Sequence, residues 1–330
     1  MLASIGVSPV LTRRNPMTQG THWTAADLPD LSGKVFVVTG GNSGLGLETA
    51  RELSRKSAHV VIACRDAAKA ATALSEIRAG ARGASIEAVN LDLASLASVR
   101  AFAEAFCANH HRLDALCNNA GVMALPYRKT ADGFEMQFGT NHLGHFALTG
   151  FLLDVLCATP GARVVNVSSS AHRFGRIRFD DLQSERSYGR WRAYGQSKLA
   201  NLLFTYELAR RVEKAGVALL SVAAHPGYAA TNLQTAGPRM EGAAWMERLS
   251  LLGNRLFAQS AGMGALPTLY AATAPDVRGG DYFGPDGVGE MWGSPTRVRS
   301  SARAQDRESA ARLWQVSRDL TGVRFPRLGD

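Results

Sequence analysis

The sequence has only four cysteines among its 330 residues, and it has no long apolar run. None of the cysteines forms a CxxC pair, and no Cys/His cluster has the spacing of a metal site. The apolar runs at 35–38 and 60–63 are far shorter than the roughly 18–20 residues of a membrane-spanning helix. These absences exclude a disulfide scaffold. We therefore predict that the protein has no metal site and no transmembrane segment. They lead us to expect a cytoplasmic protein.

The start of the chain also lacks the order of a secretory signal. Residues 1–16 are weakly apolar, and Arg13 and Arg14 follow the apolar stretch, whereas a signal peptide places its basic residues first. Met17 opens a more typical polar start. Residues 1–16 are therefore interpreted either as the result of a start codon assigned too far upstream or as a flexible tail. We predict an N-terminal extension over 1–30.

Acidic residues are fewer than basic ones, 28 against 37, which gives a formal net charge of +9. Such a balance fits a nucleic acid, an acidic membrane surface, a phosphorylated ligand or nothing specific. No RNA- or DNA-binding motif, aromatic stacking run or basic helix accompanies it. The basic excess is concentrated at 173–192 and 297–327. We interpret it as solvated surface and predict no nucleic-acid partner.

From Gly33 onward, short β-branched runs alternate with amphipathic stretches. Apolar strands separated by helices indicate βαβ units and a parallel sheet that is covered on both faces. Because such crossovers are right-handed, the sequence predicts an α/β fold with a doubly wound parallel sheet, the Rossmann fold, in a single domain over 31–330. Strands are expected at 34–39, 59–64, 85–90, 113–118, 163–168 and 217–224, and helices at 45–56, 67–79, 95–108, 138–156 and 194–214.

A glycine-rich segment, TGGNSGLG at 39–46, stands between the first predicted strand and the first predicted helix. Glycines let the backbone turn tightly and approach a pyrophosphate, whose charge meets the N-terminus of the helix. The spacing is TGxxxGxG rather than GxGxxG, and the absence of a following Gly-Lys-Ser/Thr argues against a P-loop. The strand–loop–helix context predicts a nucleotide site.

The ends of the second and third strands carry charged residues that can choose the nucleotide. An acidic residue at the end of the second strand holds a ribose 2′-hydroxyl in such folds, whereas an Arg accommodates a 2′-phosphate. Arg65 stands there and favours NADP(H), with NAD(H) as the alternative; it could also be a solvated Arg ahead of Asp66 as a helix cap. Asp92, after the third strand, fits either the adenine amino group or a cap for the helix that begins near Ser95.

Tyr194 and Lys198 are four residues apart in a predicted helix, so both point to one face. A phenol has an unperturbed pKa near 10, and a nearby ammonium favours the phenolate and lowers that pKa. This effect is a physical reason to pair a Tyr with a Lys for proton transfer. A YxxxK pair by itself is weak evidence, because most such pairs lie on protein surfaces.

Polar side chains follow two other predicted strands. Ser168–Ser170 come after the strand that starts at Arg163, and a hydroxyl at this edge of a sheet either donates to a carbonyl oxygen or caps a turn. The segment 118–121 (NNAG) ends the fourth strand. Asn141 lies inside the helix predicted at 138–156, where an Asn is more often a local hydrogen-bonding residue than a catalytic one.

Together, and in this order, the motifs resemble the classical form of the short-chain dehydrogenase/reductase family. The resemblance covers about residues 31–233, from TGGNSGLG through NNAG, Asn141, the serine and YxxxK to Pro226-Gly227. More narrowly, NHLGHF, NVSSSAH, YGQSKLANLLF and AAHPGYAATNL look like the branch of retinol dehydrogenases and protochlorophyllide-reductase-like oxidoreductases. The resemblance implies an oxidoreductase that transfers hydride between a nicotinamide cofactor and a carbonyl or alcohol, and Arg65 points to NADP(H).

The resemblance also implies a role for each matching residue. Tyr194 is expected to be the general acid in carbonyl reduction and the base in alcohol oxidation, and Lys198 to lower the pKa of Tyr194 and hold the nicotinamide ribose. Ser169, the second of the Ser-Ser pair, is expected to polarise the substrate oxygen, and Asn141 to hold a water that links Lys198 to solvent. The cofactor residues implied in this way are Gly40, Asn42, Ser43, Gly44, Leu45, Gly46, Arg65, Asp92, Leu93, Asn118, Ala120, Gly121, Tyr194, Lys198, Pro226, Gly227 and Thr231.

The chain departs from compact family members at three places. Ser169 and Tyr194 are 25 positions apart, about twice the usual separation, and we expect the additional segment 171–193 to form part of the pocket rim. Ser57 replaces the family's usual Gly before the second strand, and residues 285–330 form a C-terminal extension. An apolar rim and the apolar helical pattern at 242–257, if it is a lid rather than core packing, predict a lipophilic substrate such as a retinoid, steroid, aldehyde or xenobiotic ketone. The expected rim residues are Met123, Leu125, Phe134, Phe174, Phe179, Tyr228 and Leu233.

One alternative function accompanies this interpretation. A non-catalytic NADP(H)-binding sensor or scaffold would need the cofactor loop alone, and the complete set of Asn141, Ser169, Tyr194 and Lys198 argues against it. Family membership further implies a homodimer or homotetramer formed through the two long helices, which the sequence does not distinguish from a monomer.

Overall fold

An eight-stranded sheet forms the centre of the computed structural model, which describes residues 22–229 and 259–329. The strand order is β3-β2-β1-β4-β5-β6-β7-β8, and all neighbouring pairs are parallel except β7 and β8. The doubly wound parallel sheet predicted from the sequence is confirmed. The strands are β1 (Val35–Thr39), β2 (His59–Cys64), β3 (Ser85–Asn90), β4 (Ala115–Asn118), β5 (Ala162–Val167), β6 (Leu219–Ala224), β7 (Tyr282–Pro285) and β8 (Pro295–Arg297).

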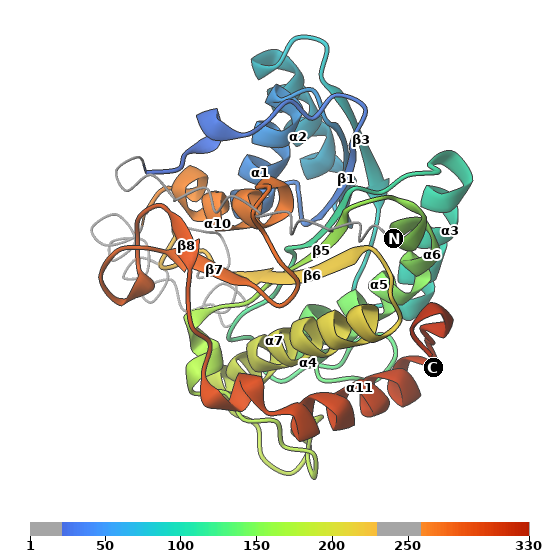
Figure 1. The fold of residues 1–330 in the computed structure, drawn as a ribbon. Coiled ribbons are helices and arrows are strands. Elements are labelled where there is room, and N and C mark those ends of the chain that lie inside the picture. Colours follow the sequence, from blue (N-terminus) through green and yellow to red (C-terminus); the bar gives the residue numbers. More distant parts are fainter. Residues whose placement is uncertain (1–21, 230–258, 330) are drawn as a thin grey trace, which may run out of the picture.

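Helices cover both faces of this sheet (Figure 1). Successive side chains of a strand point to opposite faces, so Phe36 and Val38 of β1 join the apolar cluster on one side and Val37 joins the cluster on the other. Among the described residues, no helix is long and apolar enough to cross a membrane. The first face carries α1 (Gly44–Arg55), α2 (Ala67–Gly80) and α10 (Ala261–Thr273), and the second carries α3 (Leu96–Asn109), α5 (Gly144–Phe151), α6 (Leu153–Ala158) and α7 (Arg190–Lys214).

The prediction of one continuous helix at 138–156 is wrong. This part of the chain forms α4 (Met136–Phe138), a π-helical turn at Gly139–Leu143, and then α5 and α6. The buried carboxylate of Glu135 caps the start by accepting from the N–H groups of Gln137 and Phe138, and Leu152, with φ −95° and ψ 4°, separates α5 from α6. This π-helical turn contains Asn141, and such turns are frequently found at functional sites.

Ser57 occupies a left-handed turn between α1 and β2, with φ +67°. This conformation explains why a glycine is usual at that position of the family, since a glycine adopts positive φ without strain. The strand that follows, β2, has the bounds that the sequence predicts, and so does β3.

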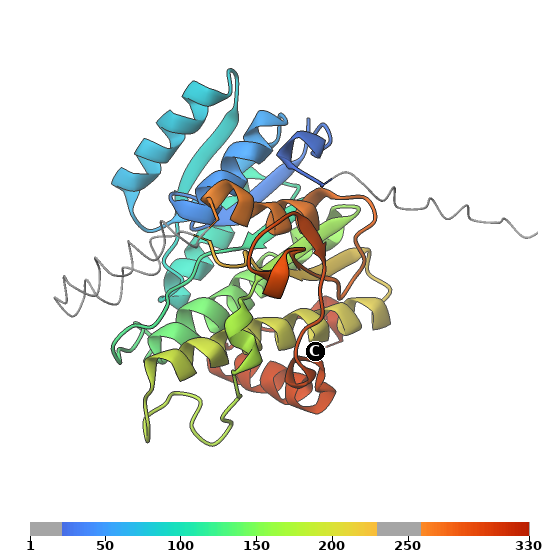
Figure 2. The ribbon, with the colours of Figure 1, turned by 90° about the vertical axis from the view of Figure 1, so that its left-hand side faces the viewer.

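The C-terminal extension forms β8, a 3₁₀ turn at Ala302–Gln305 and the helix α11 (Arg307–Thr321). In both ribbon views α11 lies along α7 on the side turned away from the sheet (Figures 1 and 2). Trp314 of α11 is buried, with ring centroids 5.2 Å from Phe146, 5.8 Å from Phe204 and 4.5 Å from Phe325. The extension therefore covers part of the helix surface through which the family resemblance predicts a dimer.

Candidate active site

The glycine-rich loop turns from β1 into α1 at the carboxyl edge of the sheet. Gly40 has φ +66°, and a Cβ on Gly46 would collide with the carbonyl oxygen of Gly40 and lie 2.5 Å from Nδ2 of Asn119. Only glycine fits this close approach of helix start and loop. The loop therefore has the shape that lets backbone N–H groups face a pyrophosphate at the N-terminus of α1.

A cavity of about 340 Å³ opens above this loop. Most of the cofactor residues expected from the sequence line this cavity. Asn118 does not line it, whereas its neighbour Asn119 does. The Asn118 side chain is instead buried between β5 and α5, where its Nδ2 donates to Asn166 of β5 at 2.9 Å and to Thr149 of α5 at 3.2 Å. The expected residues that line the cavity are Gly40, Asn42, Ser43, Gly44, Leu45, Gly46, Arg65, Asp92, Leu93, Ala120 and Gly121.

The end of β2 presents two cations to the cavity. Arg65 is exposed on its wall, and Lys69, one turn further along, lines it as well. Asp66 caps α2 by accepting from the Lys69 N–H at 3.0 Å, and this bond holds the pKa of Asp66 below its usual value. The carboxylate thus serves the helix, as one of the two sequence interpretations expected. Lys69 was not singled out from the sequence, and its position four residues after Arg65 is the pattern that could have found it.

Asp92 lines the cavity at the end of β3 and is not the cap of the following helix. That cap is Ser95, whose hydroxyl accepts from the Ser98 N–H at 3.3 Å. One carboxylate oxygen of Asp92 accepts from the Ala94 N–H at 2.9 Å, which fixes the side chain at the cavity wall. The cap interpretation of Asp92 is therefore wrong, and the adenine contact stays a prediction.

Thr39, the last residue of β1, ties the cofactor loop to the neighbouring strand. Its hydroxyl oxygen accepts from the N–H groups of Asn119 and Ala120, both at 2.9 Å, and lies 2.9 Å from Nε2 of His145. The other ring nitrogen of His145, Nδ1, lies 3.0 Å from the main-chain oxygen of Asn141. Because a carbonyl oxygen only accepts, Nδ1 carries the proton and Nε2 accepts from Thr39.

Burial lowers the pKa of His145 to about 4, so the imidazole is neutral at neutral pH. The sequence analysis missed both His145 and Thr39. His145 stands in the NHLGHF motif four residues after Asn141, a spacing that places it one helical turn away, and this spacing could have drawn attention to it.

Asn141 and Lys198 meet beside Gly121. The Asn141 side chain accepts from the Val122 N–H at 2.8 Å and donates to the Val122 oxygen at 2.9 Å, so both ends of its amide are fixed. A Cβ on Gly121 would lie 3.3 Å from Oδ1 of Asn141 and 3.5 Å from Nζ of Lys198. The site thus brings together three residues that the sequence assigned to it from three separate motifs.

Lys198 is buried on α7 and donates to the main-chain oxygen of Val167 at 3.0 Å. Burial lowers its pKa to about 8. Tyr194 lies on the same face, and Nζ of Lys198 is 5.8 Å from the centre of its ring. Burial raises the pKa of Tyr194 to about 12, and a hydrogen bond with the Ser169 side chain acts in the opposite direction. The net pKa of Tyr194 is therefore raised rather than lowered as its pairing with Lys198 predicts, because desolvation of the phenolate is the largest effect.

Ser168 and Ser169, the first two of the three consecutive serines, have different partners. The Ser168 hydroxyl donates to the Lys198 main-chain oxygen at 2.9 Å and so anchors α7. The Ser169 hydroxyl accepts from the Ala171 N–H at 3.2 Å and also hydrogen-bonds with Tyr194. Ser169 therefore caps a turn and also contacts Tyr194, so both interpretations made from the sequence apply to this residue.

Pro226-Gly227 follows β6 near the start of α1. A Cβ on Gly264 of α10 would lie 2.7 Å from Leu45 and 3.6 Å from Pro226, which shows that these chain segments are close together. Neither Pro226 nor Gly227 lines the cavity described above. Thr231, Leu233 and the apolar pattern at 242–257 lie outside the described residues.

Aromatic side chains flank Tyr194 on the expected pocket rim. A Cβ on Gly195 would lie 2.7 Å from the ring of Phe174, and the ring of Trp191 is 6.2 Å from that of Tyr194. Phe174 and Trp191 are more than half exposed. Leu125, expected on the rim, is buried instead, and Trp191 is a rim residue that the sequence analysis missed.

Comparison with known proteins agrees with this geometry. The model of the family described as short chain dehydrogenase matches residues 34–242, and the chain belongs to this family of oxidoreductases, which act on CH–OH and C=O groups with a nicotinamide cofactor. More narrowly, it belongs to the retinol dehydrogenase-like branch. It is 46% identical to mouse retinol dehydrogenase 12 over 300 residues, 89% of this chain and 88% of the relative.

Two solved structures extend the comparison. A crystal structure from Mycobacterium paratuberculosis is 44% identical, covers 93% of this chain and 100% of its own, and superposes with a TM-score of 0.76. A Beutenbergia cavernae chain assigned as an NAD(P) dependent gluconate 5-dehydrogenase, with bound NADP, is 28% identical. It covers 74% of this chain and 91% of its own, with a TM-score of 0.56.

Proposed function

We propose that this chain transfers hydride between NADP(H) and the carbonyl or alcohol of a lipophilic substrate, with Tyr194 as general acid and base. The observation that carries the proposal is the hydrogen bond between the Ser169 and Tyr194 side chains beside the buried ammonium of Lys198. A non-catalytic sensor or scaffold would not need these groups to meet. When bound, NADP(H) supplies or accepts the hydride.

We expect the two hydroxyl groups to act on one substrate oxygen. In reduction, Ser169 donates a hydrogen bond to the carbonyl oxygen and Tyr194 donates its proton to it. A pKa of about 12 keeps Tyr194 protonated at neutral pH, as a proton donor requires. In oxidation, the phenolate takes the proton from the alcohol, and the ammonium of Lys198 supplies the positive charge that favours the phenolate. Asn141 bonds with the main chain of Val122 and thereby fixes this part of the cavity wall.

The preference for NADP(H) rests on Arg65 and Lys69. Both line the cavity at the end of β2, and Arg65 makes no hydrogen bond or ion pair within residues 22–229 and 259–329. Arg suits a phosphate because its planar guanidinium offers several donors. The NADP bound to the Beutenbergia cavernae chain supports the same choice of cofactor.

A retinoid-like alcohol or aldehyde is the substrate class that we favour. The exposed rings of Phe174 and Trp191 beside Tyr194 suit an apolar molecule, and the mouse relative is named for retinol. A cytoplasmic location remains the prediction made from the sequence.

The decisive experiment measures turnover of NADPH and NADH with a panel of carbonyl compounds that contains retinal, a steroid ketone and small charged keto acids. Tyr194→Phe should lower turnover by about 10²–10⁴-fold and leave NADPH affinity within a few-fold of wild type. Tyr206→Phe, three helical turns further along α7, is the matched control and should keep its activity. Comparable turnover in Tyr194→Phe would overturn the mechanism, and reaction of the charged keto acids alone would overturn the substrate class.

A further inference from the structure

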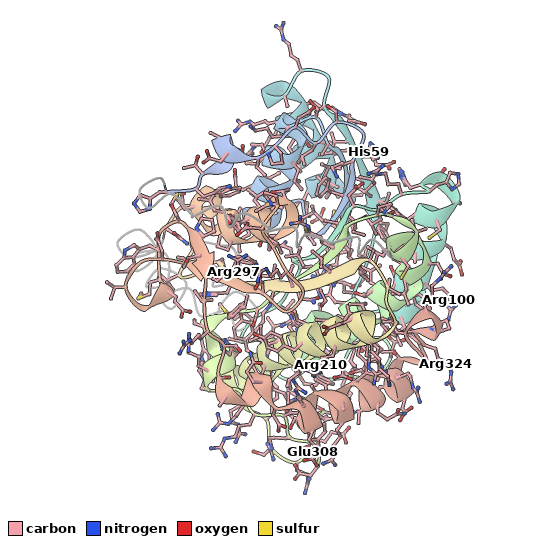
Figure 3. All side chains as sticks on the ribbon, in the orientation of Figure 1. His59, Arg100, Arg210, Arg297, Glu308 and Arg324 are labelled. Carbon is pink, nitrogen blue, oxygen red and sulfur yellow. The ribbon has the colours of Figure 1, made fainter. Side chains whose placement is uncertain are left out.

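Three side chains with metal-ligating atoms meet at the amino-terminal edge of the sheet. His59 is the first residue of β2, Glu87 is the third of β3, and His110 directly follows α3. Oε1 of Glu87 lies 3.3 Å from Nε2 of His59 and 2.7 Å from Nε2 of His110. All three ligand atoms are within 4.8 Å of one another. Figure 3 labels His59 beside the strand labelled β3 in Figure 1.

The fold itself places these side chains together. In the β2–β3 ladder His59 pairs with Ser85 and Val61 with Glu87, so His59 and Glu87 belong to the residues that face α3. The ring of His110 stacks on Phe106 of α3, with centroids 4.6 Å apart, and this contact turns it towards the same point. The three ligands are therefore held by regular elements rather than by loop tips.

The spacing of the ligand atoms is close to that of a tetrahedral metal site. Zn–N and Zn–O bonds of about 2.0–2.1 Å place neighbouring ligand atoms about 3.3–3.4 Å apart. The His59–Glu87 distance of 3.3 Å already has this value, and the His110–Glu87 distance of 2.7 Å needs a small opening. Glu87 is 43% exposed and His110 17%, so the carboxylate can move and solvent can reach a fourth position.

A second contact orients one of the ligands. Nδ1 of His59 lies 2.6 Å from the hydroxyl of Ser85. When this nitrogen donates to Ser85, the lone pair of Nε2 points at the cluster, which is the tautomer that binds metal. Histidines that bind metals commonly donate their other ring N–H to such a partner.

We infer that His59, Glu87 and His110 form a Zn²⁺-class site that clamps β2, β3 and the end of α3. Two imidazoles and one carboxylate suit Zn²⁺ and its neighbours in the transition series better than Ca²⁺ or Mg²⁺, which take oxygen ligands. Sequence spacing gave no sign of it because the three ligands come from distant parts of the chain.

The clamp is separate from the proposed reaction. The cofactor cavity lies at the carboxyl ends of the strands, where Arg65 follows β2, whereas His59 opens the same strand. A metal at this cluster should therefore change the stability of the fold and leave cofactor binding unchanged. This independence keeps the inference testable whatever the fate of the proposed activity.

The experiment treats the whole chain with a chelator, removes the chelator, and titrates ZnCl₂ by calorimetry and thermal unfolding. We expect one equivalent to bind and the melting temperature to rise by about 3–5 °C at saturation, because a ligand bound only by the folded state stabilises it. Glu87→Gln and His110→Ala should each weaken binding at least about tenfold, and Ser85→Ala by about tenfold. X-ray absorption should show two imidazole nitrogens at about 2.0–2.1 Å.

His111→Ala is the matched control, since His111 is the exposed neighbour of His110 and is not one of the three ligands. It should bind Zn²⁺ like wild type. The inference is overturned if no single saturable equivalent binds, or if Glu87→Gln binds as tightly as His111→Ala. Because Glu87→Gln preserves the size of a partly exposed side chain, a circular dichroism spectrum like that of wild type will show that loss of binding is not loss of folding. NADPH affinity should be the same with and without Zn²⁺.

Discussion

Nδ1 of His145 lies 3.0 Å from the main-chain oxygen of Asn141, and the opposite nitrogen of the same ring binds Thr39. One neutral imidazole thus connects the end of β1, where the cofactor loop begins, to the π-helical turn that carries Asn141. The connection is buried, so neither partner has water as a substitute. His145 therefore fixes the position of the cofactor loop relative to Asn141, although in the proposed mechanism it contacts neither the substrate nor Tyr194.

Replacement of His145 by Leu should therefore impair both folding and reaction. The Asn141 oxygen would lose its bond with the ring, and the Thr39 hydroxyl would keep only the main-chain oxygen of Cys117, 3.3 Å away, as an acceptor. A buried group that loses its partner costs about 1–3 kcal/mol. We expect a lower urea midpoint and a kcat reduced about tenfold or more. His142→Leu is the control, because His142 bonds with Ser317 of α11 and should lose stability while kcat is kept. Equal kcat in the two variants would contradict the positioning role of His145.

Stability should decrease as the pH falls from about 6.5 towards 4. Burial lowers the pKa of His142 to about 3 and those of His145 and His172 to about 4, so the unfolded chain binds these protons first. Each histidine then contributes stability that is complete above its unfolded pKa and is lost below it, on the order of 1–2 kcal/mol by pH 5. Glu135 opposes the trend, since burial raises its pKa. Urea unfolding at pH 7 and pH 5 measures the difference, and equal stability at the two pH values would refute the assignment.

Arg65→Asp should move the cofactor preference from NADPH to NADH. A charge-assisted bond to the 2′-phosphate is worth about 1.5–3 kcal/mol, which corresponds to a change of about 10–100-fold in the ratio of kcat/KM values. Lys69→Ala should shift the ratio in the same direction by less, because Asp66 shares its charge at 3.3 Å. Arg82→Asp, an exposed change of equal charge outside the cavity, should leave the ratio unchanged. An unshifted ratio in Arg65→Asp would exclude the phosphate contact.

Trp314→Ala should destabilise the chain by about 3–5 kcal/mol, because it empties a buried site among three phenylalanine rings. Removal of α11 should go further and expose the apolar side of α7, so that a chain ending at Asp306 self-associates while the full chain sediments as a monomer. Trp191→Ala, at a position that is 53% exposed, is the control for loss of an indole. Sedimentation velocity of the full chain as a dimer through α7 would show that the extension does not block this surface.

The sheet and the placement of the candidate catalytic residues were predictable because both depend on local patterns. Apolar runs bounded by glycine and polar residues gave β2 and β3 their bounds, and the order of the motifs brought Asn141, Ser169, Tyr194 and Lys198 to one edge of the sheet. The same patterns could not show that the helix at 138–156 is interrupted, since the π-helical turn at Gly139–Leu143 and the backbone conformation of Leu152 appear only in the structure.

Properties that depend on burial or on distant partners were out of reach of the sequence. The pKa of Tyr194 is set by desolvation, which only the packed structure reveals, and the spacing of Tyr194 and Lys198 suggested the opposite direction. Asn118 and Asn119 are equivalent in the motif, yet only Asn119 lines the cavity, because alternate residues leave a strand in opposite directions.

The position of α11 has a consequence for how the chain folds as it is made. The helix that bears Tyr194 and Lys198 is synthesised well before the residues that cover its outer side, so an apolar surface stays open on the ribosome until Trp314 emerges. During that interval α7 can pair with any other apolar surface, including that of a neighbouring nascent chain. We therefore expect docking of α11 to be a late step of folding that closes this surface to other chains.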